Sequence, residues 1–203
     1  MQLYYSETLS PRKACAVAHN VNAELDFVFV DLGRGEQATE EFGRLNPNHK
    51  VPVLVDGPHS LWESTAIMCR LAQITGSDLW PTDDRQAEVI RWLTWDALQF
   101  TRFGVELYFR NLIGPHVGLG PPEPDAVREA QTGFRKSAAI LDAHLANADW
   151  AVDSTPTIAD FALGAALPYA VGAAIPFEEF PNISHWYARL CALRGWLEPF
   201  PKR

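Results

Sequence analysis

Residues 46–67 contain the groups whose types and spacing best support binding chemistry in this sequence. Val51-Pro52 precedes the apolar pair Val53-Leu54, and Ser64 follows a predicted turn and short strand. Proline has no backbone N–H for a ladder, so it leaves the backbone N–H and C=O of the preceding residue free at a sheet edge. Serine is a good N-cap, and a helix N-terminus attracts anions. The segment therefore predicts a site where a peptide-like ligand pairs with the chain and places a carboxylate at Ser64.

The elements that must position these residues begin with an α/β region. β-branched and aromatic residues predict short strands at 2–5, 25–30, 53–55 and 60–62. Helices are expected from Ser10-Pro11, with serine as N-cap, and at 37–45 and 64–75. A strand-helix-strand start favours parallel pairing, whereas the tight turn before residue 60 makes the last two strands antiparallel. Residues 1–76 are thus predicted to form a domain with a mixed four-stranded sheet.

The pattern changes after residues 77–84, which are predicted to be a linker. Apolar residues then recur at helical spacing, and no further strand pattern appears. Residues 85–112 read as one long helix, and further helices are expected at 127–145 and 181–193. Residues 85–203 are therefore predicted to form an all-helical domain.

Composition excludes several classes of protein. The chain has 203 residues, of which 47% are hydrophobic, and a formal net charge of −8. This supports a packed core and argues against a nucleic-acid partner, which calls for clustered Lys and Arg. The sequence contains no run of about 18 apolar residues, so no membrane span is expected.

The cysteine and histidine patterns also limit the chemistry. Three cysteines without a CxxC motif fit a reducing compartment, which predicts a cytoplasmic protein. The six histidines lack metal-ligand spacing, and neither GxGxxG nor a Walker motif occurs. Neither a metal nor a nucleotide cofactor is therefore expected.

Four motifs in a fixed order resemble those of one family. They are Leu3-Tyr4-Tyr5 leading into Leu9-Ser10-Pro11, Asn46-Pro47 through Val51-Pro52-Val53-Leu54, Glu63-Ser64-Thr65-Ala66-Ile67, and Thr157-Ile158-Ala159-Asp160-Phe161. With these motifs the sequence resembles cytosolic glutathione S-transferases, of a bacterial type with serine or threonine in the first loop. The resemblance covers nearly the whole chain. It implies a thioredoxin-like first domain, a helical second domain, a homodimer and glutathione as co-substrate.

The resemblance gives the first segment a specific ligand. It implies a cis peptide bond at Val51-Pro52 and backbone pairing of Val51 with the cysteinyl unit of glutathione. Ser64 would hold the γ-glutamyl carboxylate, and Glu63 would compensate the ammonium group or orient the loop. His49 and Lys50 are expected at the glycyl carboxylate, with solvated loop charges as the alternative.

The reaction of such an enzyme needs a thiolate. A free thiol has a pKa of about 8.5, and lowering it by about 2 units requires roughly 2.7 kcal/mol of preference for the anion. A donating hydroxyl near a helix N-terminus can supply that order of energy. Ser10 is the predicted donor, with Thr8 and Ser6 of the same loop as alternatives. Cys15 falls inside the first helix, which departs from relatives that use a loop cysteine.

The electrophile is expected to bind beside the first loop and the helix at 85–112. The predicted lining residues are Leu9, Phe100, Thr101, Arg102, Phe103 and Tyr108. Aromatic residues at helical spacing also form ordinary cores, and Arg102 could form a surface ion pair instead.

Thr157 and Asp160 are predicted to be structural. The pair matches the S/T-x-x-D variant of the capping box, which satisfies the free N–H groups at the start of a buried helix.

Three functions remain open at this point. The leading one is conjugation of glutathione to hydrophobic electrophiles. The second is glutathione-dependent reduction of disulfides or peroxides, in which glutathione supplies both electrons. The third is a non-catalytic ligand carrier or interaction module with the same fold.

Overall fold

Strand β1 (Gln2–Tyr5) lies inside a four-stranded sheet in the computed structural model, which describes residues 1–202. The strand order is β2-β1-β3-β4, with β2 at Asp26–Phe29, β3 at Val53–Asp56 and β4 at His59–Trp62. β1 pairs with β2 in parallel and with β3 in antiparallel orientation, and β3 pairs with β4 in antiparallel orientation. The predicted mixed sheet is confirmed.

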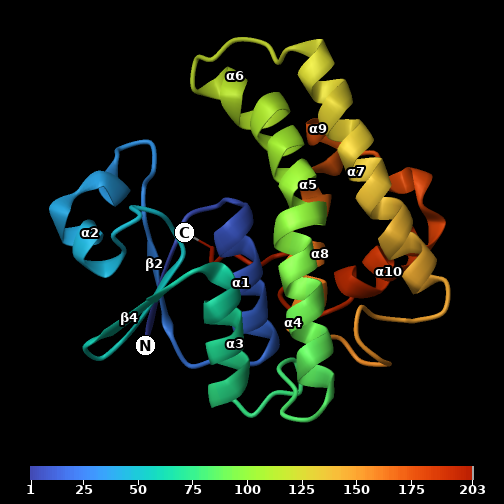
Figure 1. Cartoon of the computed structure of the whole chain (residues 1–203). Coiled ribbons are helices and arrows are strands. Elements are labelled where there is room, and N and C mark those ends of the chain that lie inside the picture. The colour runs from blue at the N-terminus through green and yellow to red at the C-terminus, as the bar shows by residue number, and fades with distance from the viewer. Residues whose placement is uncertain (203) are drawn as a thin grey trace. The chain divides into compact units, whose positions relative to one another are not determined.

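Helices cover both faces of this sheet. Figure 1 shows α1 (Leu9–Asn20) and α3 (Ser64–Ile74) side by side on one face, and α2 (Glu40–Leu45) on the other. Successive side chains of β1 point to opposite faces of the sheet, as in any β-strand. Leu3 and Tyr5 are buried, while the ring of Tyr4 lies 6.3 Å from that of Phe42 in α2, centroid to centroid.

The middle of the chain is helical. The helices are α4 (Arg85–Trp95), α5 (Thr101–Tyr108), α6 (Gly114–His116), α7 (Pro124–Leu145), α8 (Ile158–Leu163), α9 (Ala170–Ala173) and α10 (Pro181–Cys191). Short 3-10 turns occur at Glu36–Ala38, Leu167–Tyr169 and Phe177–Glu179. The predicted order, an α/β part followed by helices alone, is confirmed.

The long helix predicted at 85–112 is interrupted by two π-helical turns. They are η2 (Asp96–Phe100) and η3 (Phe109–Ile113), and the backbone stays helical through both. Polar side chains support them locally: Thr101 Oγ1 donates to Asp96, and Asn111 Nδ2 donates to Leu107 O at 3.1 Å. A uniform apolar spacing cannot predict such turns, because they depend on individual side chains.

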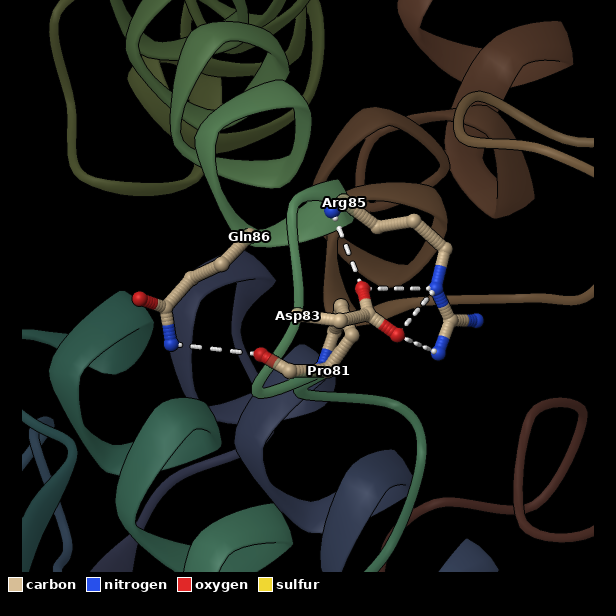
Figure 2. Close-up of polar contacts among 4 residues, drawn as sticks. All are labelled: Pro81, Asp83, Arg85 and Gln86. Carbon is tan, nitrogen blue, oxygen red and sulfur yellow. Dashed lines mark hydrogen bonds and ion pairs between the residues drawn. The ribbon is translucent and has the colours of Figure 1, made fainter.

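Polar contacts define where α4 begins. The guanidinium group of Arg85 donates to both carboxylate oxygens of Asp83, at 2.8–3.1 Å, and the backbone N–H of Arg85 donates to Asp83 Oδ1 at 3.0 Å (Figure 2). Gln86 Nε2 donates to Pro81 O at 3.2 Å. The hydrogen bonds from Arg85 lower the pKa of Asp83.

The chain divides into two units by its internal contacts. One consists of Met1–Trp80 together with the segment that begins at Leu193, and the other of Pro81–Ala192. The predicted domains, 1–76 and 85–203, differ from this division at the C-terminus. The difference arises because the last segment packs against α1 and β1, through contacts that are far apart in sequence. Among residues 1–202, no helix is long and apolar enough to cross a membrane.

The cysteines allow a first test of the packing. Cys15 is fully buried in α1, and burial raises its pKa to about 12. Burial also raises the pKa of Cys69, in α3, to about 11. We expect Cys15 to resist iodoacetamide at pH 8 in the folded protein, and Cys69 to react roughly 10²-fold more slowly than a free thiol, because the thiolate is the nucleophile. Peptide mapping measures both, with the urea-unfolded chain as control. Native labelling of Cys15 at the unfolded rate would contradict the packing described.

Candidate functional site

Three segments of the first unit meet at one end of the sheet. Tyr4 of β1 lies opposite Val53 of β3, and Val53 lies opposite Trp62 of β4. The loop after β1, the residues before β3 and the residues after β4 must therefore share this end. The register brings together the loop 6–8, Val51-Pro52 and Glu63-Ser64, which are separated by up to 58 positions in the sequence.

Val51 presents an open backbone at this end. The Val51-Pro52 peptide bond is cis, as the resemblance implies. Val51 is half-buried, and within residues 1–202 neither its N–H nor its C=O makes a hydrogen bond. The ladder of β3 begins only at Val53. Val51 can thus pair with an extended ligand in the way an edge strand does.

Asn46 shapes the loop that leads to Val51, a role that its place in the Asn46-Pro47 motif did not predict. It is buried, its Nδ2 donates to Lys50 O at 2.6 Å, and its Oδ1 accepts from the backbone N–H of Asn48 at 2.9 Å. Asn46 therefore closes the turn and sets the direction of the backbone before Val51. The signal in the sequence was an Asn-Pro-Asn turn pattern.

His49 and Lys50 project from this loop. His49 has a φ of 54°, and its Nδ1 lies 2.8 Å from Gln37 O. The absence of a side chain at Gly43 makes room for this ring, since a Cβ there would lie 2.7 Å from His49 Cε1. Nε2 is the ring nitrogen left for a ligand. Lys50 is exposed, and its place at a ligand carboxylate stays a prediction.

The start of α3 differs from the prediction in one respect. Glu63, not Ser64, occupies the N-cap, with φ 72° and ψ 114°, so the predicted N-cap role of Ser64 is wrong. Ser64 is the first helical residue and is buried. No side chain caps this helix. Because the Glu63 side chain makes no capping hydrogen bond, the first N–H groups of α3 can meet an anion.

The start of α1 is also shifted. The helix begins at Leu9, and Thr8 is the N-cap in extended conformation, so the predicted capping role of Ser10 is wrong. Ser10 is exposed at the second helical position, Thr8 is half-buried, and Ser6 is buried. Within residues 1–202, none of the three hydroxyl groups makes a hydrogen bond. All three therefore stay candidates for donation to a thiolate, and no acidic residue in the first turn opposes the anion.

Most of the residues predicted for the electrophile pocket have partners in their own unit. Phe100 is buried, with its ring 5.0 Å from that of Phe134, and the ring of Tyr108 lies 4.9 Å from that of Tyr169. Phe103 packs on Gly133 of α7. A lining role for the predicted residues stays a prediction.

The remaining members of that set have varied surroundings. Leu9 is buried at the start of α1, and Thr101 is bonded to Asp96. Arg102 is exposed, with its guanidinium 5.5 Å from the ring centroid of Phe103. An open pocket of about 320 Å³ on the helical unit is lined by other residues: Glu106, Phe109, Arg110, Gly114, Leu119, Gly120, Pro121, Pro122 and Glu123.

Thr157 and Asp160 form a capping box at α8. Thr157 Oγ1 accepts from Ala159 N at 3.3 Å, and the Asp160 carboxylate accepts from Thr157 N at 2.8 Å. Asp160 also accepts from Ala151 N at 2.9 Å and from Trp186 Nε1 at 2.8 Å. The sequence showed the box but not the two distant donors, which tie three segments of the helical unit together.

The chain was compared with protein families and with solved structures. The family model for the N-terminal domain of glutathione S-transferases matches residues 3–73, and the model for their C-terminal domain matches residues 105–194. Glutathione transferase F7 from Populus trichocarpa superposes with a TM-score of 0.91 at 20% identity, over 98% of this chain and 96% of its own. A delta-class glutathione transferase from Nilaparvata lugens is 27% identical, with a TM-score of 0.84 over 98% and 92% of the two chains.

A third solved structure contains a ligand. It is a glutathione S-transferase-I bound with lactoylglutathione, 22% identical, with a TM-score of 0.85 over 94% of this chain and 93% of its own. These likenesses confirm the thioredoxin-like α/β part followed by a helical part.

Proposed function

Because the chain belongs to the glutathione S-transferase family, we propose that it binds glutathione on its first unit and transfers the thiolate to a hydrophobic electrophile. The open backbone of Val51 carries this proposal. An N–H and a C=O left free before a strand match the cysteinyl unit of a tripeptide, because an extended peptide offers both partners.

The neighbouring groups would hold the two ends of the tripeptide. The uncapped start of α3, with Ser64 buried beside it, suits the γ-glutamyl carboxylate. Glu63 is exposed at the same turn and can meet the ammonium group. His49 and Lys50, across the loop set by Asn46, suit the glycyl carboxylate. The likeness to a transferase bound with lactoylglutathione supports a glutathione-derived ligand.

The loop after β1 would stabilise the thiolate. Ser10 is our first choice of donor because its hydroxyl is exposed at the start of α1. The helix N-terminus adds a favourable field for an anion. The ionised sulfur then attacks the electrophilic carbon and expels the leaving group, and proximity in the ternary complex lowers the barrier further. We propose that Arg102 and its predicted neighbours on 100–108 contact the electrophile.

The proposal extends to the location, the oligomeric state and the role of the protein. We place the protein in the cytoplasm as a homodimer that detoxifies electrophiles, of the bacterial type with a serine or threonine in the first loop. Half-buried and buried free thiols, Cys15, Cys69 and Cys191, fit a reducing compartment.

The test is conjugation of glutathione to 1-chloro-2,4-dinitrobenzene by the purified chain, with glutathione binding measured by calorimetry. We expect saturable binding and a rate well above that of buffer. Binding without any rate enhancement would refute the transferase and favour a carrier, while absence of binding would refute the site itself.

A second reaction is favoured by one observation. Thr8, rather than Ser10, is the residue at the N-cap of α1. The resemblance to bacterial relatives with threonine in this loop implies glutathione-dependent reduction. Two glutathione molecules would then reduce one disulfide to two thiols and form glutathione disulfide. Fast reduction of hydroxyethyl disulfide beside negligible aryl conjugation would select this alternative.

A further inference from the structure

The residues after Leu193 return to the first unit and run along α1. We name residues 194–200 the C-terminal strap. Arg194 O accepts from Asn20 Nδ2 at 3.4 Å, and Arg194 Nη1 donates to Asn22. The ring of Phe200 stacks on Tyr5 of β1 at 5.9 Å between centroids. All but the first residue of the strap lie beyond the C-terminal family match, which ends at residue 194.

Arg12 connects the strap to the loop after β1. Its side chain is buried, its Nη2 donates to Trp196 O at 2.5 Å, and its guanidinium lies 5.4 Å from the centre of the Trp196 ring. The backbone N–H of the same residue donates to Thr8 O at 3.0 Å. Arg12 thus connects the strap to Thr8, the N-cap of α1, through one hydrogen bond on each side.

The approach of the strap to α1 requires glycine at one position. Gly195 has a φ of 75°, and a Cβ there would lie 2.5 Å from His19 Cβ and 3.1 Å from Ala16 O. A side chain at residue 195 would therefore push the strap away from the helix. Trp196, the next residue, is fully buried, so a displaced strap would also withdraw its indole.

We propose that the strap is a positioning device for the thiol site: through Arg12 and Trp196 it holds the start of α1, and hence Thr8 and Ser10, in the geometry that stabilises a thiolate. The inference rests on the proposed function, because it assigns Arg12 and Trp196 to that site as positioning residues. The reason is geometric. A hydroxyl donates effectively only over a narrow range of distance and angle, so a loosened first turn weakens the bond to sulfur before the fold is lost.

The test compares Gly195→Ala with Gly76→Ala. Both glycines have positive φ, 75° and 64°, but a Cβ at Gly76 would meet nothing within 4 Å. The control thus carries similar backbone strain without the collision. The pKa of bound glutathione, read from thiolate absorbance, is expected to rise by about one unit in Gly195→Ala only, which corresponds to about tenfold less conjugation at low pH. The amide of Arg12 is expected to exchange its hydrogen faster in the same variant.

Each result bears on the proposal. A lower Tm in Gly195→Ala with unchanged thiol pKa and unchanged exchange at Arg12 would overturn it, since the strap would then only add stability. If Gly195→Ala fails to fold, Arg12→Lys takes its place, because lysine keeps the positive charge but lacks the planar guanidinium group that bonds to Trp196 O. The pKa of bound glutathione and the hydrogen exchange of the amide at residue 12 are then measured in the same way. If the pKa of glutathione bound to the wild-type protein equals that of free glutathione, the proposed function is refuted instead. Hydrogen exchange at Arg12 would still decide whether the strap holds α1.

Discussion

Replacement of Asp160 by alanine is expected to lower the free energy of unfolding by about 3–5 kcal/mol. The carboxylate is fully buried and accepts from three N–H groups, those of Ala151, Thr157 and the Trp186 indole. Without it all three donors are left buried and unpaired, at a cost of about 1–3 kcal/mol each before relaxation. Urea unfolding followed by tryptophan fluorescence measures the change.

The matched control for this prediction is Glu129→Ala. Glu129 is an exposed residue of α7 in the same unit, and its loss is expected to change the stability by no more than about 0.5 kcal/mol. Equal midpoints for Asp160→Ala and wild type would show that the capping box does not hold the helical unit together.

The stability contributed by Asp160 also depends on pH. Burial raises its pKa, although its N–H donors act in the opposite direction. A group with a raised pKa in the folded state binds its proton more tightly there than in the unfolded chain. Its contribution is therefore fully present below the unfolded pKa, about 3.9, and declines as the pH rises through the folded value. Asp160→Asn is expected to lack this component of the pH profile.

Replacement of Ser10 by alanine is expected to lower kcat/KM for aryl conjugation by about 10–100-fold at pH 6.5. The loss follows from a higher pKa of bound glutathione, since a donor to the sulfur is removed. The deficit should shrink near pH 9, where the thiol ionises without help. Steady-state rates from pH 6 to 9, together with the KM for glutathione, separate this effect from weaker binding.

Two variants accompany this measurement. Ser60→Ala removes an exposed serine hydroxyl from β4 and should leave the pH profile unchanged. Thr8→Val removes the alternative donor at the N-cap of α1. A profile shifted by Thr8→Val but not by Ser10→Ala would assign the role to Thr8 and strengthen the reductase alternative.

Local patterns were sufficient for the framework of the fold. The β-branched segments, the tight turn before β4 and the change to helical spacing after residue 84 predicted the mixed sheet and the helical part, because these signals depend on neighbours in sequence. The capping residues Thr157 and Asp160 could be predicted for the same reason, because the capping box is a motif of residues close in sequence. The N-cap of α1 was misplaced by two positions and that of α3 by one, since hydroxyl side chains near a helix start favour a cap but do not fix which residue takes that position.

The sequence by itself determined the ligand-binding segments and their order: the loop before Val51-Pro52, the turn at Glu63-Ser64 and the loop at Thr8 and Ser10. Tertiary structure alone decided how they meet, through a strand register that brings them to one end of the sheet. It also decided the contacts of Asp160 with Trp186 and of Arg12 with Trp196. The physical reason is that these bonds join residues 26 and 184 positions apart, and no local pattern of propensity or spacing encodes which distant donor fills a buried acceptor.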